Sequence, residues 1–209
     1  MTKHPHRLRR TVVLLTISSA LLAACTGAGE GDAPAETPVG PHVPTGPAST
    51  LTPQRGDGET VELDGAGSLV APADAQVEDV SSTESGAQQV NIRMPDADES
   101  GLPAVQVTWG PDDVGVFEQS WTSENAAKVD GSISQYVRSI VQWPGSAESV
   151  VATWEEDVAL TTGDTLPVSA TRLTVQDDDG TTVTVLALAP RGQLEGSEVE
   201  GTLRSLELG

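Results

Sequence analysis

The chain has few of the side chains that usually carry catalysis or bind metals. Its 209 residues include one cysteine, Cys25, and three histidines, at positions 4, 6 and 42. A serine or cysteine nucleophile of the triad type needs a histidine base, and structural zinc is usually held by cysteine and histidine. Because neither residue type occurs after position 42, we expect no triad-type catalytic centre and no zinc site there.

Other catalytic motifs are missing as well. The sequence contains no Gly-x-Ser-x-Gly elbow and no glycine-rich phosphate-binding loop. Its 31 Asp and Glu residues include every residue type that a two-carboxylate glycosidase requires, but no spacing pairs any two of them. We therefore predict no catalytic residues, with a carboxylate-based hydrolase of wall polysaccharide as the enzymatic alternative.

The first 25 residues have the pattern of an export signal. No acidic residue occurs in them, and a short apolar run leads to a small-residue site at Leu22-Ala23-Ala24-Cys25. This order defines a secretory signal peptide, and the apolar run is too short for a membrane-spanning helix. We predict a signal peptide over residues 1–24. The basic residues that precede the run are Lys3, Arg7, Arg9 and Arg10.

The ending Leu22-Ala23-Ala24-Cys25 resembles the lipobox of bacterial lipoproteins. In that family the cysteine thiol receives a diacylglycerol, and cleavage leaves the acylated cysteine as the new N-terminus. The resemblance implies lipid attachment at Cys25, palmitate among the acyl chains, and no other cofactor. Two or more acyl chains anchor a protein stably, which places this one at the outer face of the cell membrane, facing the wall. The alternative is an ordinary secreted protein, and the Sec and twin-arginine routes both stay open.

Positive charge is scarce in the part that would be exported. The whole chain has 11 basic and 31 acidic residues, a formal charge of −20, and removal of the leader changes this to −24 because four basic residues are lost. Nucleic-acid binding depends on Lys and Arg contacts to phosphates, so nucleic acid is excluded as a partner. Anionic lipid headgroups are disfavoured for the same reason. A basic envelope protein would be attracted.

The residues after Cys25 predict a tether. The segment consists mainly of Gly, Pro, Ala, Thr and acidic residues, and too few large apolar groups occur in it to form a core. We predict a lipidated, disordered tether over residues 25–60 with an upper reach of about 100 Å, at about 3.1 Å per extended residue. Residues 61–209 are predicted to form a single domain.

Alternating apolar and polar residues predict strands in this domain. Asp177-Asp178-Asp179-Gly180 is expected to be the turn of a hairpin. The strand after this turn is apolar on both faces, which predicts a central position in the sheet. The predicted strands cover residues 90–94, 105–109, 114–121, 150–160, 166–176 and 181–189.

Two segments have helical spacing instead. Apolar residues three and four positions apart predict a helix over residues 132–142 that ends at Trp143-Pro144-Gly145, with residues 124–129 as a candidate extension. Ser197 and Glu200 have the spacing of a capping box, which predicts a short C-terminal helix. The apolar positions of the first helix are Ile133, Tyr136, Val137 and Ile140, and those of the second are Val199, Leu203 and Leu206.

Taken in order, these elements resemble lipoproteins of high-GC Gram-positive bacteria that share the PsbP/Mog1-like α/β/α sandwich, the LpqN type. The resemblance covers residues 61–208 and rests on element order. It implies an α+β fold: an α/β/α sandwich with a mainly antiparallel sheet of about six to seven strands. It also implies a binding or accessory role in the cell envelope, not an enzyme mechanism, and it assigns no functional residue.

The few aromatic residues all lie between positions 109 and 154. Their expected role is to fill the seam between helix and sheet. The alternative is that one or two of them remain exposed as a partner patch, because Trp and Tyr are enriched at binding hot spots. Trp143 is the candidate for such a patch, since it lies where the predicted helix ends.

One acidic segment partly resembles a calcium-binding loop. Asp96-x-Asp98-x-Ser100-Gly101 matches the first half of an EF-hand loop, but the twelfth position is Val107 and not the required Glu. We predict ordinary polar turns for this segment and for residues 177–180, and no metal site.

The predicted function is that of a membrane-anchored, extracytoplasmic lipoprotein that acts as a non-catalytic binding module. Its expected partner is an envelope protein, with a basic protein as one candidate. A carrier or sensor of an apolar ligand is the alternative, and it would need a large apolar pocket. The sequence leaves the ligand and the oligomeric state open.

Replacing Cys25 tests the anchor. Cys25→Ala should abolish incorporation of labelled palmitate, because the chain has no other thiol. Thr26→Ala should label normally. The measurement is metabolic labelling followed by electrophoresis, and palmitate incorporation into the Cys25→Ala protein would contradict lipidation at this residue.

Overall fold

The computed structural model describes residues 42–83, 85–160 and 163–209, which belong to one compact unit. The predicted signal peptide, Cys25 and the first part of the predicted tether lie outside the described residues. No helix in the described ranges is long and apolar enough to cross a bilayer.

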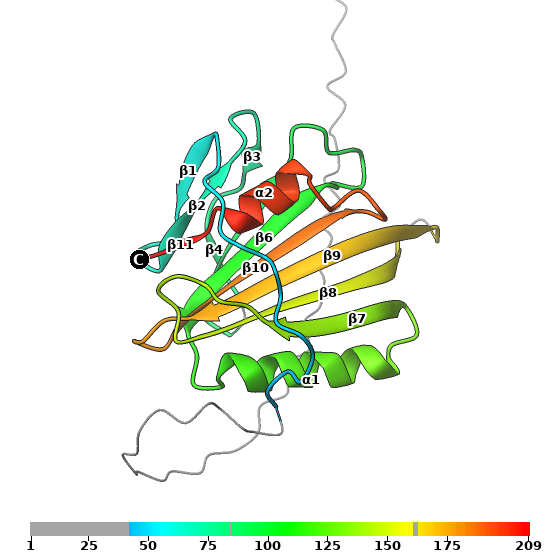
Figure 1. The fold of residues 1–209 in the computed structure, drawn as a ribbon. Coiled ribbons are helices and arrows are strands. Elements are labelled where there is room, and N and C mark those ends of the chain that lie inside the picture. The colour runs from blue at the N-terminus through cyan, green and yellow to red at the C-terminus, as the bar shows by residue number, and fades with distance from the viewer. Residues whose placement is uncertain (1–41, 84, 161–162) are drawn as a thin grey trace, which may run out of the picture. The chain divides into compact units, whose positions relative to one another are not determined.

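An antiparallel eight-stranded sheet organises the fold (Figure 1). Its strands run in the order β3-β5-β6-β10-β9-β8-β7, and β4 also pairs with β5. The α+β class is as expected. The sheet has more strands than the expected six to seven, because β3 and β4 have only two residues each and are too short to be recognised in the sequence. The strands are β3 (Gln76–Val77), β4 (Ser81–Ser82), β5 (Gln88–Arg93), β6 (Ala104–Pro111), β7 (Ile133–Ile140), β8 (Glu148–Ala159), β9 (Thr165–Gln176) and β10 (Thr181–Pro190).

The predicted hairpin is confirmed as β9 and β10. The Asp177 carboxylate accepts hydrogen bonds from the backbone N–H groups of Asp179, at 2.9 Å, and Thr181, at 2.8 Å. These bonds fix the turn through the local bonding that Asp favours. The central position of β10 is also confirmed, since it lies between β6 and β9.

A second sheet of three strands was not predicted. It has the order β1-β2-β11 and comprises β1 (Glu59–Glu62), β2 (Gly67–Ala71) and β11 (Glu207–Leu208). Leu63 and Leu69 bring this sheet into the main core, where both are fully buried. β11 has two residues, too short for an alternation to be detected in sequence.

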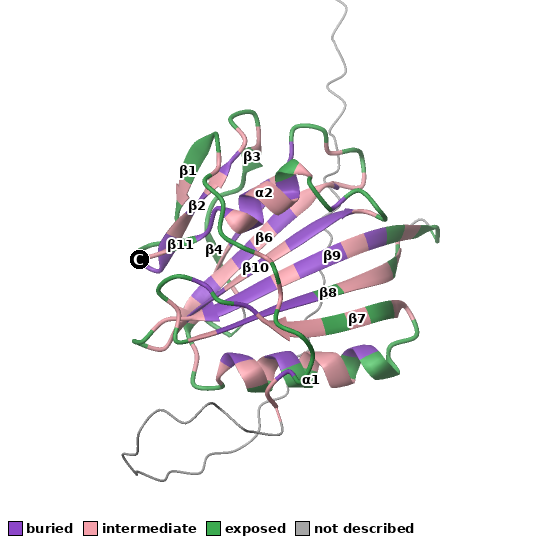
Figure 2. Ribbon diagram, in the orientation of Figure 1, coloured by how far each residue is buried: buried purple, intermediate pink, exposed green. Residues whose placement is uncertain are grey.

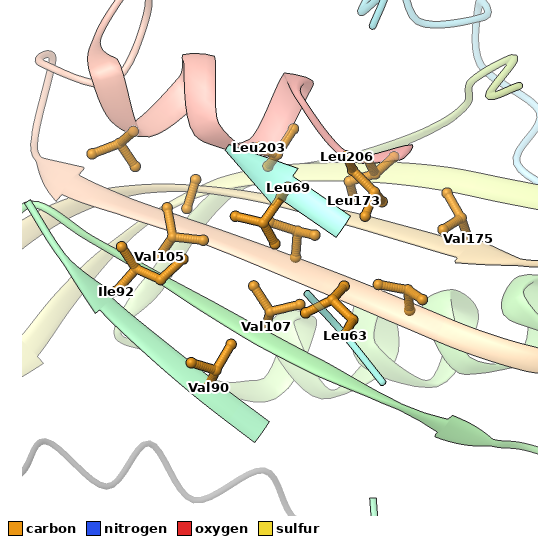
Figure 3. Packing of buried hydrophobic residues seen from close by; sticks show 14 of the residues in the cluster. Leu63, Leu69, Val90, Ile92, Val105, Val107, Leu173, Val175, Leu203 and Leu206 are labelled. Atoms are coloured by element: carbon orange, nitrogen blue, oxygen red, sulfur yellow. The ribbon is translucent and has the colours of Figure 1, made fainter. Parts of the chain in front are cut away.

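The eight-stranded sheet has two different faces, and the burial of β5 and β6 alternates with the two-residue period of a strand (Figure 2). In β9 and β10 some residues of both faces are buried. We call one the covered face, because the second sheet and helix α2 (Glu198–Arg204) pack on it (Figure 3). We call the opposite one the open face, of which helix α1 (Val116–Val129) covers the part on β7 and β8. The covered face carries Val90, Ile92, Val105, Val107, Leu173, Val175, Val183 and Val185, with Leu69, Leu203 and Leu206 packed against them.

The cap of α2 agrees with the predicted capping box. The Ser197 hydroxyl accepts a hydrogen bond from the backbone N–H of Glu200 at 3.3 Å. In return the Glu200 carboxylate accepts from the N–H of Gly196, at 2.5 Å, one residue before the N-cap. Both bonds satisfy N–H groups that the start of a helix leaves without partners.

The predicted strand over residues 114–121 is wrong. Helix α1 (Val116–Val129) occupies this region, and residues 124–129 form its second half. Its buried residues, Val116, Ser120 and Ala127, are four and seven positions apart, which is helical spacing, but two of them are small. The apolar pattern of a helix is therefore faint, and the alternation of valines at 114 and 116 suggested a strand.

The predicted helix over residues 132–142 is also wrong, because this segment forms β7. The register pairs Ser134 with Glu155 and Val137 with Thr153, so two residues of β7 lie opposite one residue of β8. This arrangement is a β-bulge. In a regular strand, successive side chains on one face are two positions apart. The extra residue places Ile133 and Tyr136 three positions apart on one face, and a spacing of three is typical of a helix.

Residues 42–56, which we call the strap, belonged to the predicted tether but lie against the domain (Figure 1). The N–H of Ser49 donates to the carbonyl of Ile140 at 2.8 Å, at the outer edge of β7. Further along, the N–H of Gln54 donates to the carbonyl of Arg204 at 2.8 Å. The ordered chain thus begins before the expected boundary at residue 61. Residues 25–41 remain a predicted tether.

The strap also contacts α1 at its beginning. The rings of His42 and Trp121 pack edge to face with centroids 4.4 Å apart. The guanidinium of Arg138 on β7 donates to the carbonyl of His42 and forms an ion pair with Glu124 of α1 at 2.5 Å. A single buried arginine therefore joins the strap, the edge strand and the helix.

Trp143 does not lie at a helix end or on the surface. It follows β7, is 5% exposed, and donates its indole N–H to the carbonyl of Leu206 at 3.2 Å. This position in the main core overturns the prediction of a partner patch at Trp143.

The burial of Trp143 can be tested by truncation. Trp143→Ala should lower the free energy of unfolding by about 3–5 kcal/mol, the usual cost of removing a buried aromatic side chain. Trp121→Ala is the matched control, because Trp121 is 37% exposed and should cost about 1 kcal/mol or less. Urea unfolding of both variants measures this, and equal losses would contradict the core position.

Candidate functional site

Three neighbouring strands bring an aromatic pair and an arginine together on the open face. Tyr136 of β7 and Trp154 of β8 stack with ring centroids 5.6 Å apart and planes at 26°. The Arg172 guanidinium carbon, from β9, lies 5.7 Å from the Trp154 ring centroid, within the range of a cation–π contact. Its Nη2 donates to the Tyr136 hydroxyl oxygen at 3.0 Å. We call these three residues the Tyr–Trp–Arg cluster.

The bulge in β7 places Tyr136 in this cluster. Gln135 and Tyr136 together lie opposite Trp154, and Gln135 has a φ of +54°. A side-chain-bearing residue in this left-handed region costs about 1–2 kcal/mol. Bulges often redirect a side chain next to a functional site. Here the bulge directs Tyr136 toward Trp154 at a cost in backbone strain.

Trp154 is oriented by a second contact. Its indole N–H donates to a carboxylate oxygen of Glu156 at 3.2 Å. Because Glu156 is two residues further along β8, both side chains lie on the same face of the strand. This bond fixes the ring against which Tyr136 and Arg172 pack, and it places one negative charge at the border of the cluster.

The charge of Arg172 has no counter-ion among the described residues. Arg138 pairs with Glu124, whereas Arg191 pairs with Glu155 and Asp157. Arg172 contacts a phenol and an indole in place of a carboxylate. A half-buried and uncompensated positive charge is unusual in a chain with a formal charge of −20, and it makes this point of the surface attractive to an anion.

Tyr136 is held as a neutral phenol. Burial raises the pKa of its hydroxyl above the ordinary value, and the opposing effect of the nearby Arg172 charge is smaller. The phenol oxygen accepts the hydrogen bond from Arg172, so the phenol proton is left to donate. The cluster thus presents hydrogen-bond donors from two different side chains.

Apolar residues adjoin the cluster on the side of β10. In the register of β9 and β10, Leu186 lies opposite Arg172 and Leu188 lies opposite Ala170. Val158 and Leu166 continue this surface and are half-buried. We call Leu186, Leu188, Ala170, Val158 and Leu166 the apolar strip. Leu188 and Ala170 are buried, so Leu186 is the residue of the strip that offers partly exposed apolar surface beside Arg172.

Amide side chains lie on the far side of the apolar strip. Gln106 of β6 is opposite Leu186 and donates to the Asn91 side chain at 3.1 Å. Asn91 in turn donates to the carboxylate of Glu78 at 2.9 Å. Across the open face the chemistry therefore changes from a cation with aromatic rings, through aliphatic residues, to amides.

The covered face has a groove beneath the strap. It encloses about 340 Å³ between Leu51 of the strap, the sheet residues Val137, Val151 and Thr171, and Arg204 of α2. This volume is at the low end for ligand pockets. The Arg204 guanidinium uses two of its donors on Thr52, since its Nε donates to the Thr52 carbonyl at 2.9 Å and its Nη2 donates to the Thr52 hydroxyl at 3.3 Å.

The acidic segment around Asp98 forms the predicted polar turn. The Asp98 carboxylate accepts from the backbone N–H of Ser100 at 2.7 Å and from its hydroxyl at 2.5 Å. In the ranges that the structure describes, no three His, Cys, Asp or Glu side chains are grouped closely enough to hold a metal ion.

Sequence reasoning identified neither the cluster nor the strip. Of the site residues predicted from sequence, Cys25 lies outside the described residues and Trp143 is in the core. The crowding of aromatic residues between positions 109 and 154 was a partial signal, because Tyr136 and Trp154 come from it. Arg172 gave no signal, since only the strand register brings it beside them.

Comparison with known proteins adds a distant structural likeness. No protein-family model matches the chain, and no curated protein matches it. One similar solved structure is the crystal structure, at 1.50 Å resolution, of a protein from Bacteroides thetaiotaomicron VPI-5482, with 14% sequence identity and a TM-score of 0.36. The match covers 73% of this chain and 48% of the other, so this chain spans about half of that protein. At this TM-score the likeness supplies no argument about function.

The raised pKa of Tyr136 gives a direct test of the cluster. Because Tyr136 is the only tyrosine, absorbance at 295 nm should follow this group alone, and it should ionise above pH 10.0, the ordinary value. In urea the same titration should return to the ordinary value. The folded pKa is the higher one, so this group's contribution to stability is present below about pH 10 and is lost as the pH rises through the folded pKa. Ionisation of the folded protein below pH 10 would contradict the described environment.

Proposed function

We propose that this protein is a lipid-anchored, extracytoplasmic binding module without catalytic activity, and that its ligand or partner docks on the open face. The observation that carries the proposal is the uncompensated charge of Arg172, held by Tyr136 and Trp154 beside the apolar strip. Trp, Tyr and Arg are the residue types most enriched at binding hot spots.

The anchor and the location rest on the N-terminal sequence. A signal peptide over residues 1–24 and a diacylglyceryl group on Cys25 would hold the domain at the outer face of the cell membrane, in contact with the wall. We include in this proposal the relation to LpqN-type, PsbP/Mog1-like lipoproteins, for which the α+β fold with a large antiparallel sheet provides general support.

The arrangement of the open face favours binding over reaction. The Arg172 guanidinium and the Tyr136 hydroxyl are hydrogen-bond donors, and the neighbouring Leu186 offers only apolar surface. Such a site holds an acceptor group and an adjoining apolar group in place. The strongest role for the cluster is therefore recognition.

Site-specific photocrosslinking in the native cells tests this proposal. A photoreactive residue in place of Leu186 should capture a reproducible membrane-associated species, because Leu186 lies next to Arg172 on the open face. The same residue in place of Val129, which is 86% exposed on α1, is the matched control and should capture nothing specific. Adding Arg172→Gln should remove the adducts at position 186.

Two outcomes would contradict the docking surface. Equal adducts from positions 129 and 186 would indicate non-specific encounter. An absence of adducts at position 186 in a folded, membrane-bound protein would show that the open face is not occupied in the cell.

A further inference from the structure

We propose that the Tyr–Trp–Arg cluster and the apolar strip bind an amphipathic carboxylate, a small organic anion whose carboxylate is joined directly to an apolar chain or ring. This inference rests on the proposed function and names the ligand class of the same site. The anion would lie on Arg172 and Tyr136, and the apolar part would lie on the half-buried Leu186.

The donors suit the two oxygens of a carboxylate. A guanidinium has five N–H donors, and one of those on Arg172 is used by the Tyr136 oxygen at 3.0 Å. The phenol proton has no acceptor among the hydrogen bonds of the described residues. Two adjacent side chains thus have donors left for one ligand, and hydrogen bonds to an ionised acceptor are about twice as strong as neutral ones.

The donors are also held in place before a ligand arrives. The guanidinium of Arg172 lies over the Trp154 ring, and its Nη2 is fixed by Tyr136. Trp154 is itself fixed by Glu156. A preorganised site loses less side-chain entropy on binding. A free surface arginine such as Arg55 would lose more of this entropy when it bound the same ligand.

The surrounding charge favours a monoanion. The chain has a formal charge of −20, and Glu156 adds a negative charge at the border of the cluster. Each further negative charge on the ligand would increase repulsion by this field. A single carboxylate satisfies the donors at the smallest electrostatic cost, whereas a phosphate dianion meets more repulsion.

The apolar strip accounts for the second half of the ligand. Leu186 is the register partner of Arg172 across β9 and β10, so a group bound at the guanidinium continues directly onto leucine. Leu186 is only half-buried, and covering its remaining surface is favourable. A purely polar anion such as acetate would leave this gain unused.

The test is calorimetric titration of the full chain, in micelles of a neutral maltoside detergent, with 3-phenylpropionate as the probe. We expect it to bind at least about tenfold more tightly than 3-phenylpropanol, which lacks the charge, or acetate, which lacks the ring. Arg172→Gln should weaken binding at least about tenfold, and Arg55→Gln, the matched exposed control, should not change it.

Tyr136→Phe provides a second variant that keeps the ring stacked on Trp154. It should weaken the probe about threefold or more, because it removes only the hydroxyl donor. The ¹⁵N resonance of the Arg172 side chain should shift on titration, which locates binding at the cluster. Circular dichroism of each variant checks that it is folded.

The outcomes separate the two proposals. Equal binding of 3-phenylpropanol, tighter binding of phenyl phosphate, or an unchanged affinity in Arg172→Gln would overturn the carboxylate assignment, while adducts at position 186 would still support the binding module. Conversely, probe binding as expected without adducts in cells would keep the ligand class and overturn docking at the membrane.

Discussion

One extra residue in β7 determines what the open face can do. Without the bulge, strict alternation would place Ile133, Gln135 and Val137 on one side and turn Tyr136 toward the strap, because a one-residue shift moves every following side chain to the other face. With the bulge, Tyr136 joins Trp154 and its oxygen meets Arg172. The strained backbone of Gln135 is stabilised by the stacking and hydrogen bonding that it makes possible. The orientation of Arg172, and with it the proposed ligand site, depends on this irregularity.

The covered face of the sheet supplies the larger part of the core, and the open face carries the proposed recognition site. The covered face carries the fully buried valines and leucines of β5, β6, β9 and β10, and α2 and the second sheet exclude water from them. On the opposite face of the same strands, Val168 and Ala170 are also buried, but the larger core lies on the covered face. Arg172 and Leu186 can therefore remain half-exposed between buried neighbours without a loss of the fold. The rigid sheet in turn keeps the cluster at fixed spacing, as a binding site on strands requires.

The sequence predicted those elements whose local signals agreed with the final fold. The Asp177–Gly180 turn and the alternation beside it predicted β9 and β10, and Ser197 with Glu200 predicted the start of α2. Helix α1 was missed because its buried side includes the small residues Ser120 and Ala127. β7 was missed because its bulge imitates helical spacing. The cluster was beyond reach for another reason: Tyr136 and Arg172 are 36 positions apart, and no local pattern encodes the register that joins them.

The strap has a mechanical consequence for a protein held by its N-terminus. His42 follows Cys25 by 17 positions, so a lipid on Cys25 would hold the start of the strap within about 60 Å of the membrane, at about 3.5 Å per extended residue. A tether that ended at residue 60 would allow about 100 Å. Tension along the chain would first load the contacts of His42 with Trp121 and Arg138, then the bond from Ser49 to Ile140. These contacts are made to α1 and β7, and β7 is the strand that holds Tyr136. Pulling on the anchor and occupancy of the ligand site would therefore act on the same edge strand.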